Sequence, residues 1–334
     1  MVPVHSTDLL SVDSNLTRLF PLLPFLTSLH LVPEMPLSDR VLTALQCKDG
    51  IGELRSLKGV KLSVPVGNAP AQSLGPSPDA VVRLLRNCPR LEQLEIACTD
   101  TNDLEPEPMV DLGFSSFRDE AAVTLPPLYL PNLKFLCLSI VPTGSLFLTL
   151  LCTPLPSLRH LVVAPHSDQH NAQLNALLAT NGRSLISLRI NTPRHLPTST
   201  GDVLAQPLLT SCPELRYLAL DQQLLPMLTL LEPAQDVDNG ESGGGARSGS
   251  PRPHHPLRIL TIPRPNARFL REVEVLLPHL PSLTVVRARD VRWLRAGVSG
   301  KALETGVQGE MHEWRRRFAR RGVRLVDGDW RDPG

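Results

Sequence analysis

The stretch from Leu84 to Cys98 reads Leu-Leu-Arg-Asn-Cys-Pro-Arg-Leu-Glu-Gln-Leu-Glu-Ile-Ala-Cys, and its pattern recurs along the chain. Pro89 has no backbone N–H and fixes its own φ, so a helix that precedes it must end there. After the break, Leu94 and Ile96 are two positions apart and share one face of an extended segment. The stretch predicts a helix end, a break and a short strand with Leu91, Leu94 and Ile96 on its buried side.

The start of the same helix is also marked. Ser77, Pro78 and Asp79 precede a run of apolar residues. Serine is a favoured N-cap, proline suits the first helical position, and an aspartate opposes the positive end of the helix dipole. One unit is therefore helix, break and strand. Neither element can bury its apolar side alone, whereas stacked copies can.

Nine copies of the apolar triplet follow one another, with first residues 25 to 42 positions apart. The two gaps of 42 contain an acidic run at 100–111 and a glycine-rich run at 240–250. Leucine-rich repeats have a period of roughly 20–29 residues. We expect an α/β leucine-rich-repeat solenoid, a curved horseshoe like ribonuclease inhibitor, with parallel strands on its concave face and helices outside. The triplets are Leu26/Leu29/Leu31, Leu57/Val60/Leu62, Leu91/Leu94/Ile96, Leu133/Leu136/Leu138, Leu158/Leu161/Val163, Leu185/Leu188/Ile190, Leu215/Leu218/Leu220, Leu257/Leu260/Ile262 and Leu283/Val286/Ala288.

Four parts are predicted along the chain. Residues 1–231 carry the N-terminal and central repeats, and residues 232–256 form a disordered Gly/Ser/Pro insertion that includes His254 and His255. Residues 257–303 carry the last repeats. Residues 304–334 are predicted to form a basic helix and a capping strand that cover the last repeat.

The predicted C-terminal helix, residues 304–321, has two different sides. Met311, Trp314 and Phe318 form an apolar stripe, and Gly322 is a helix stop. The other side carries Arg315, Arg316, Arg317, Arg320 and Arg321. This cluster is either a solvated face or a site for phosphate, an acidic partner or nuclear import. The acidic residues of 99–124 are likewise either solvated or a contact for a basic partner.

Composition narrows the classes of partner. The 334 residues carry a net charge of +1, so no global field favours nucleic acid or membrane. Charge is uneven: residues 287–334 hold 12 Lys+Arg and 7 Asp+Glu, which leaves 22 and 26 in residues 1–286. No run of about 18 apolar residues predicts a membrane span. The six cysteines include no C-x-x-C pair, and no signal peptide is found, so we expect a cytoplasmic or nuclear protein.

The sequence contains no recognisable catalytic constellation. The letters G-x-S-x-G occur at 240–244 in the glycine-rich run, but no strand leads into a helix there, so no nucleophile elbow is predicted. H-E-x-x-H is missing, and no Gly-Lys-Ser/Thr follows the glycine-rich run. His166 and His170 are four apart, which suits either one metal ion or a helix cap, but no third ligand is evident nearby. We therefore expect a non-enzyme that holds neither a cofactor nor a metal.

The candidate binding surface consists of the strand residues that alternate with the buried triplets. Side chains of a strand point alternately to its two faces, so these residues form rows on the concave side. Aromatic residues with arginine are typical of protein hot spots, although each residue could equally be an ordinary exposed one. The residues predicted to contact a protein target are His30, Lys61, Glu95, Phe135, His160, Arg189, Tyr217 and Arg287.

Three segments carry a resemblance to a known family. Residues 87–98 and 211–220, with their Cys-Pro pairs, and residues 156–163 resemble the cysteine-containing leucine-rich repeats of F-box proteins, and the irregular spacing is similar to the fungal members. The resemblance implies that the repeats hold a substrate protein while an N-terminal F-box binds a cullin–RING ubiquitin ligase adaptor. No F-box motif is found in this sequence.

The resemblance favours the substrate-recognition part of a ubiquitin ligase receptor. The alternative is a stand-alone repeat protein that regulates an enzyme, of the ribonuclease-inhibitor or GTPase-activating kind. A GTPase activator would need an exposed arginine on a loop near the first repeats, and Arg40 and Arg55 are weak candidates.

Overall fold

The computed structural model describes residues 6–32, 37–62, 77–98, 126–138, 145–164, 168–191, 208–220, 255–263, 267–293 and 306–332. The chain divides into two compact units, residues 1–166 and 167–334, and each is described by itself. Short strands alternate with helices in both units, and all strand pairs described within them are parallel. The predicted α/β class with parallel strands is confirmed.

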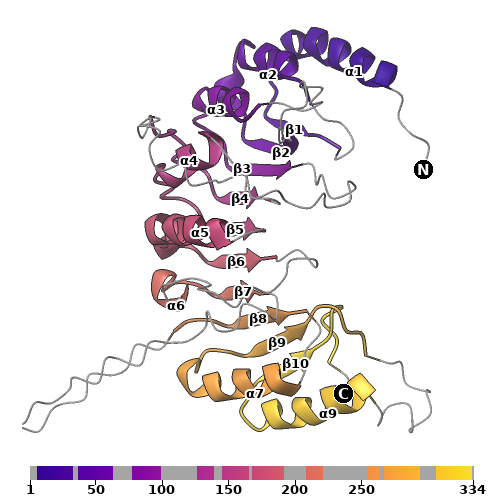
Figure 1. Ribbon diagram of the computed structural model, residues 1–334, viewed down its shortest axis with the longest axis vertical. Coiled ribbons are helices and arrows are strands. Elements are labelled where there is room, and N and C mark those ends of the chain that lie inside the picture. The colour runs from indigo at the N-terminus through magenta and orange to yellow at the C-terminus, as the bar shows by residue number, and fades with distance from the viewer. Residues whose placement is uncertain are drawn as a thin grey trace, which may run out of the picture. The chain divides into compact units, whose positions relative to one another are not determined.

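Unit 1 contains the strands β1 to β5, which pair in sequence order among the described residues. The helices α2, α3 and α4 follow one another along one side of these strands (Figure 1). Its elements are α1 (Ser6–Leu19), η1 (Phe20–Leu22), β1 (Ser28–His30), α2 (Asp39–Gln46), η2 (Ile51–Glu53), β2 (Ser56–Leu62), α3 (Pro78–Arg86), β3 (Gln93–Cys98), β4 (Phe135–Leu138), α4 (Ser145–Leu151) and β5 (His160–Val163).

Unit 2 contains the strands β6 to β10, again paired in sequence order where the chain is described. The helices α7 and α9 lie side by side in this unit (Figure 1). Its elements are α5 (Asp168–Asn181), η4 (Gly182–Ser184), β6 (Ser187–Ile190), α6 (Leu208–Ser211), β7 (Tyr217–Ala219), β8 (Ile259–Ile262), α7 (Ala267–Leu276), η6 (Leu277–His279), β9 (Val285–Ala288), α9 (Gly306–Ala319) and β10 (Arg324–Val326).

The core of each unit is built on the middle residue of the triplet, which is in register from strand to strand. Each such residue, once buried, contributes about 1.5–3 kcal/mol. Eight of the nine predicted triplets are completely buried, while Leu26 and Leu29 of the first are half-buried. The middle residues are Leu29, Leu57, Leu94, Leu136 and Leu161 in unit 1 and Leu188, Leu218, Leu260, Val286 and Leu325 in unit 2.

The frame predicted for the second triplet was wrong by one motif position. Leu57 was placed first, but β2 pairs it with Leu94, the middle residue of the next triplet. The first position belongs to Leu54, which is fully buried. The error arises because β2 contains one extra residue, so that Leu57, Val60 and Leu62 imitate the spacing of the motif.

The extra residue of β2 forms a β-bulge at Lys58 and Gly59, which together face Glu95 of β3. Gly59 has a φ of 73°, in the left-handed region that favours glycine. A Cβ atom at this position would lie 2.2 Å from the carbonyl oxygen of Leu31. The bulge therefore requires glycine for both its backbone conformation and its close approach to β1.

Helix N-termini in unit 1 share a Ser–Asp arrangement. The predicted cap Ser77 is confirmed: its hydroxyl accepts a hydrogen bond from the first turn of α3 at 3.3 Å. Asp39, in the preceding helix, accepts from the backbone N–H and the hydroxyl of Ser77 at 2.6 and 2.9 Å. Ser38 caps α2 in the same way and donates to Asp13 of α1 at 2.7 Å. Each carboxylate thus fixes the start of the next helix in the row.

The cysteines of the two Cys-Pro pairs are structural. Cys88 and Cys212 are fully buried, and the thiol of Cys88 donates to the carbonyl oxygen of Leu84 at 3.3 Å. Burial raises the pKa of each of these two thiols to about 12. They remain protonated near neutral pH and are poor nucleophiles. The thiols of Cys47, Cys88, Cys137, Cys152 and Cys212 are free.

The C-terminal cap is a helix followed by a short strand. The helix α9 buries Met311, Trp314 and Phe318 as one stripe. Gly322 follows with a φ of 76°, and its N–H and that of the next residue return to carbonyls in the last turn, both at 3.0 Å. This is the Schellman arrangement expected of a glycine helix stop. The strand β10 then pairs with β9 as the last described strand of unit 2.

A buried carboxylate organises the end of the cap. Asp327 follows β10 at the position that an aliphatic residue occupies in the triplets, and it is fully buried. It accepts backbone N–H bonds from Trp293 at 3.0 Å, Asp329 at 2.9 Å and Arg331 at 2.8 Å. Three charge-assisted bonds of this kind offset the cost of burying the charge. They fix the loop that carries Trp330.

His255 was predicted to lie in the disordered insertion, and the structure corrects this. Its side chain is buried in unit 2, where Nε2 lies 3.0 Å from the carbonyl oxygen of Cys212 and Nδ1 accepts from the N–H of Leu257 at 3.2 Å. These contacts fix the neutral tautomer that is protonated on Nε2. Burial lowers the pKa of His255, an effect opposed by bonds to the carbonyls of Cys212 and Leu209 and by the charge of Glu214.

Two glycine substitutions distinguish the cost of the left-handed backbone from the cost of the close approach at Gly59. Gly322→Ala introduces a left-handed alanine where no heavy atom lies within 4 Å of the added Cβ, and about 1 kcal/mol of stability should be lost. Gly59→Ala adds the clash with Leu31, so its cost should be greater by at least about 1 kcal/mol. Urea unfolding of each variant measures both losses. Equal losses would show that β2 does not approach β1 as described.

The buried histidine predicts a pH dependence of stability. The pKa of His255 is lower in the folded state than in the unfolded chain, so the unfolded chain binds more protons. The stability that the neutral histidine contributes is therefore present above about pH 6.5 and is lost as the pH falls below that value. His255→Gln keeps a side-chain donor for Cys212 without titrating. The urea midpoint of the variant should therefore fall less than that of the wild type between about pH 7.5 and pH 5.5. Parallel curves would contradict a neutral, buried His255.

Candidate interaction surface on the strands

The side of the strands opposite the buried triplets is here called the strand face, and register aligns its residues in rows. Neighbouring strands lie about 4.8 Å apart, so row neighbours are within side-chain contact. In unit 1 the first row is Ser28, Ser56, Gln93, Phe135 and His160, and the second is His30, Lys58, Glu95, Cys137 and Val162. In unit 2 the rows are Ser187, Tyr217, Ile259, Val285 and Arg324, then Arg189, Ala219, Thr261, Arg287 and Val326.

The structure brings two of the predicted residues of unit 1 together. Phe135 and His160 are direct register partners on β4 and β5. His30 lies opposite Lys58 rather than Lys61, because the bulge in β2 shifts the register. Lys61 lies near the end of β2, where its register partner on β3 is Ala97. Lys58 was not among the predicted residues, because regular alternation along β2 does not account for its extra residue.

In unit 2 the predicted residues have different surroundings. Tyr217 covers its neighbour Thr261, whose hydroxyl donates to the phenolic oxygen at 3.2 Å. Arg189 is exposed and donates from Nε to the side chain of Asn191 at 2.9 Å. Arg287 instead contacts the C-terminal cap: it donates to the carbonyl oxygen of Gly328, and its guanidinium lies 4.6 Å from the ring centre of Trp330.

Some positions of the strand face are buried rather than exposed. Alternation alone places Cys137, Ala219, Thr261 and Val285 on the surface, yet all four are buried. They are small or medium-sized, and longer side chains lie next to some of them in register, such as Arg189 beside Ala219 and Arg287 beside Thr261. A side chain flanked at about 4.8 Å by longer ones is covered by them. The exposed part of the face is therefore narrower than predicted.

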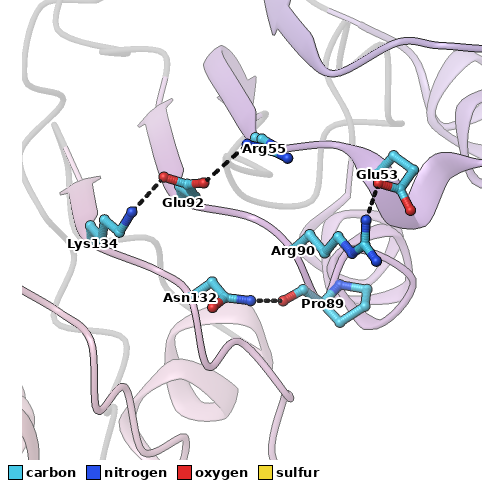
Figure 2. A network of polar contacts seen from close by, with 7 residues as sticks. All are labelled: Glu53, Arg55, Pro89, Arg90, Glu92, Asn132 and Lys134. Atoms are coloured by element: carbon cyan, nitrogen blue, oxygen red, sulfur yellow. Dashed lines mark hydrogen bonds and ion pairs between the residues drawn. The ribbon is translucent and has the colours of Figure 1, made fainter.

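A line of charged residues precedes the strands β2, β3 and β4 of unit 1 (Figure 2). Glu92 accepts a hydrogen bond from Lys134 at 2.7 Å and lies 3.8 Å from Arg55 on its other side. The hydrogen bond and charge of Lys134 lower the pKa of Glu92, with a smaller contribution from Arg55 and an opposing one from burial. Arg55, Glu92 and Lys134 each follow the first leucine of a triplet. This shared position is a signal in the sequence from which the line could have been predicted.

A second line of contacts runs beside the first (Figure 2). Arg90 forms an ion pair with Glu53, and the side-chain amide of Asn132 donates to the carbonyl oxygen of Pro89 at 3.3 Å. Both contacts join successive repeats at the helix–strand breaks. These charges are thus engaged in contacts between repeats, and Arg55, one of the two arginines considered for GTPase activation, is held beside Glu92.

The arginine cluster of α9 is only partly available for a ligand. Arg317 and Arg321 contact Glu274 of α7, the latter pair at 3.4 Å, and Arg315 pairs with Asp332 at 2.7 Å. The guanidinium of Arg317 also lies 4.3 Å from the ring centre of Trp314. The cluster therefore anchors the cap helix within unit 2, while Arg316 and Arg320 are exposed.

The described residues contain no group of three or more His, Cys, Asp or Glu side chains that could hold a metal ion. Of the pair His166 and His170, the first lies outside the described residues, as does the acidic run 99–124. In the described part of the chain, no helix is both long and apolar enough to cross a membrane.

Comparison with known proteins identifies no relative: no protein-family model matches the chain, and no curated protein matches it.

Proposed function

We propose that the chain is a leucine-rich-repeat protein that binds another protein on its strand face without catalysing a reaction. The observation that carries the proposal is the in-register rows within each unit: Phe135 and His160 are neighbours in unit 1, and Tyr217 and Arg189 stand in the rows of unit 2. The buried triplets and the two buried Cys-Pro cysteines support the repeat class. Aromatic and arginine side chains on a stable scaffold are typical of protein hot spots.

Within this proposal, the chain is the substrate-recognition part of an F-box-type ubiquitin ligase receptor, located in the cytoplasm or nucleus. The support is the resemblance of residues 87–98, 156–163 and 211–220 to the repeats of that family. The competing assignment is a stand-alone regulator of an enzyme. Arg40, one of the two arginines considered for it, is exposed but lies in the first turn of α2 and not on a loop.

Affinity capture with matched variants tests the proposal. Phe135→Ala with His160→Ala removes adjacent strand-face side chains whose truncation should not open a core cavity, because neither is fully buried. Proteins captured by the wild type should be depleted at least tenfold by this variant. Arg86→Ala with Leu148→Ala removes exposed side chains from α3 and α4 and should leave capture unchanged.

The captured partners distinguish the two assignments. A cullin–RING adaptor among them supports the ligase receptor. Its absence, together with stimulation or inhibition of a captured enzyme by the purified chain, supports the regulator. Equal depletion by both double variants would contradict binding at the strand face.

A further inference from the structure

Arg287 and Trp330 form a distinct feature at the edge of the strand face in unit 2. Arg287 stands in the second row on β9, and the ring of Trp330 stacks on its guanidinium at 4.6 Å. Trp330 is 49% exposed, whereas Trp293 and Trp314 are 7% and 5% exposed. An exposed tryptophan packed on an arginine combines the two residue types most enriched at binding hot spots.

The charge of Arg287 is not neutralised within the described residues. Its guanidinium donates to one carbonyl oxygen, that of Gly328, and its Nε is buried without a partner. An arginine has five N–H donors and prefers planar carboxylate or phosphate acceptors. The buried Nε is out of reach of a ligand, but the terminal nitrogens of Arg287 retain donors that a bound acidic group could satisfy.

The carboxylates nearest in sequence to the two residues are already engaged. Asp290 pairs with Arg289 at 3.1 Å, Asp329 lies 3.6 Å from Arg292, and Asp332 pairs with Arg315 at 2.7 Å. Asp327 accepts three backbone N–H groups. The described strands of unit 2 present Arg189, Arg287 and Arg324 on the strand face and no carboxylate. The described strand residues of this face therefore carry positive charge only.

The backbone of Trp330 gives an independent indication. Its φ is 64°, and it is the one non-glycine residue of the described chain with a positive φ. A bulky side chain in the left-handed region costs free energy, and such residues concentrate at binding sites and clamps. The bonds of Asp327 to the N–H groups on either side hold Trp330 in this conformation.

We propose that Arg287 and Trp330 are the anchor for a partner segment that presents a carboxylate next to an apolar side chain. The carboxylate binds the guanidinium of Arg287, and the apolar side chain packs on the open face of Trp330. Charge complementarity selects this partner, because the strand face of unit 2 carries arginines without carboxylates. The inference rests on the proposed protein-binding function and names the chemistry of the bound segment.

A short fluorescein-labelled peptide of alternating glutamate and leucine is the probe, with a glutamine–leucine peptide as its uncharged match. Fluorescence anisotropy with the full chain should show saturable binding of the first peptide, at least tenfold tighter than the second and weakened by salt. An unlabelled copy of the peptide should also protect tryptophan fluorescence from acrylamide, since Trp330 is the most exposed of the three tryptophans.

Three variants locate the site. Arg287→Gln should weaken binding at least tenfold, whereas Arg258→Gln, at an exposed arginine just before β8, should not. Trp330→Gly should also weaken binding at least tenfold while the melting temperature is unchanged or higher, because glycine relieves the left-handed strain. A tryptophan with a structural role only would lower the melting temperature on removal.

Several results would overturn the inference: no saturable binding, equal affinity for the glutamine peptide, or equal effects of Arg287→Gln and Arg258→Gln. Unchanged binding by Trp330→Gly would do so as well. If the probe fails while partner capture still depends on Phe135 and His160, the anchor is wrong and the proposed function stands. If capture fails, protein binding on the strand face is itself contradicted.

Discussion

The contact between aliphatic residues at the middle of each triplet is the constraint on which both units depend. Leu94 is covered on one side by Leu57 and on the other by Leu136, and all three are fully excluded from solvent. The strand pairing is parallel, so the chain must return through a connection before each new strand, and helices such as α3 and α4 serve in these connections. Because register is fixed by the leucines, gaps of 25 to 42 residues between triplets leave the pairing unchanged.

The same constraint creates the candidate surface. A strand that buries alternate side chains must present the others, and in-register pairing aligns them in rows such as Gln93, Phe135 and His160. The polar contacts at the breaks, from Glu92 to Lys134 and from Arg90 to Glu53, lie outside these rows. The cap closes the last described strand of unit 2 and brings Trp330 against Arg287. Repeat packing and the proposed partner binding thus use different residues of the same strands.

Most of the local structure could be predicted from the sequence, because it is dictated by nearest neighbours in the chain. The spacing of Leu91, Leu94 and Ile96, the cap at Ser77 and the stop at Gly322 each follow from backbone chemistry that a short segment determines. The frame of the second triplet could not be predicted, because the bulge at Gly59 depends on contact with a different strand.

Contacts between distant residues account for the remaining differences. His255 is buried by Cys212, which lies 43 positions earlier, so the composition around it says nothing about its environment. Asp327 takes an aliphatic position because backbone N–H groups from two segments converge on it. Of the candidate site, alternation predicted which side of each strand is presented. It did not predict that Thr261 is covered by Tyr217 or that Arg287 is stacked by the cap.

In-register parallel pairing is tested most directly by a disulfide that forms at one position of β3 and not at its neighbour. Glu95 and the native Cys137 are register partners, and adjacent strands bring Cα atoms to about 4.8 Å, within the range that a disulfide spans. Glu95→Cys should therefore crosslink to Cys137 under mild oxidation, as shown by peptide mapping. Gln93→Cys, two residues away along β3, should not. Crosslinking of Gln93→Cys as readily as Glu95→Cys, or of neither, would contradict the register on which both the core and the strand face depend.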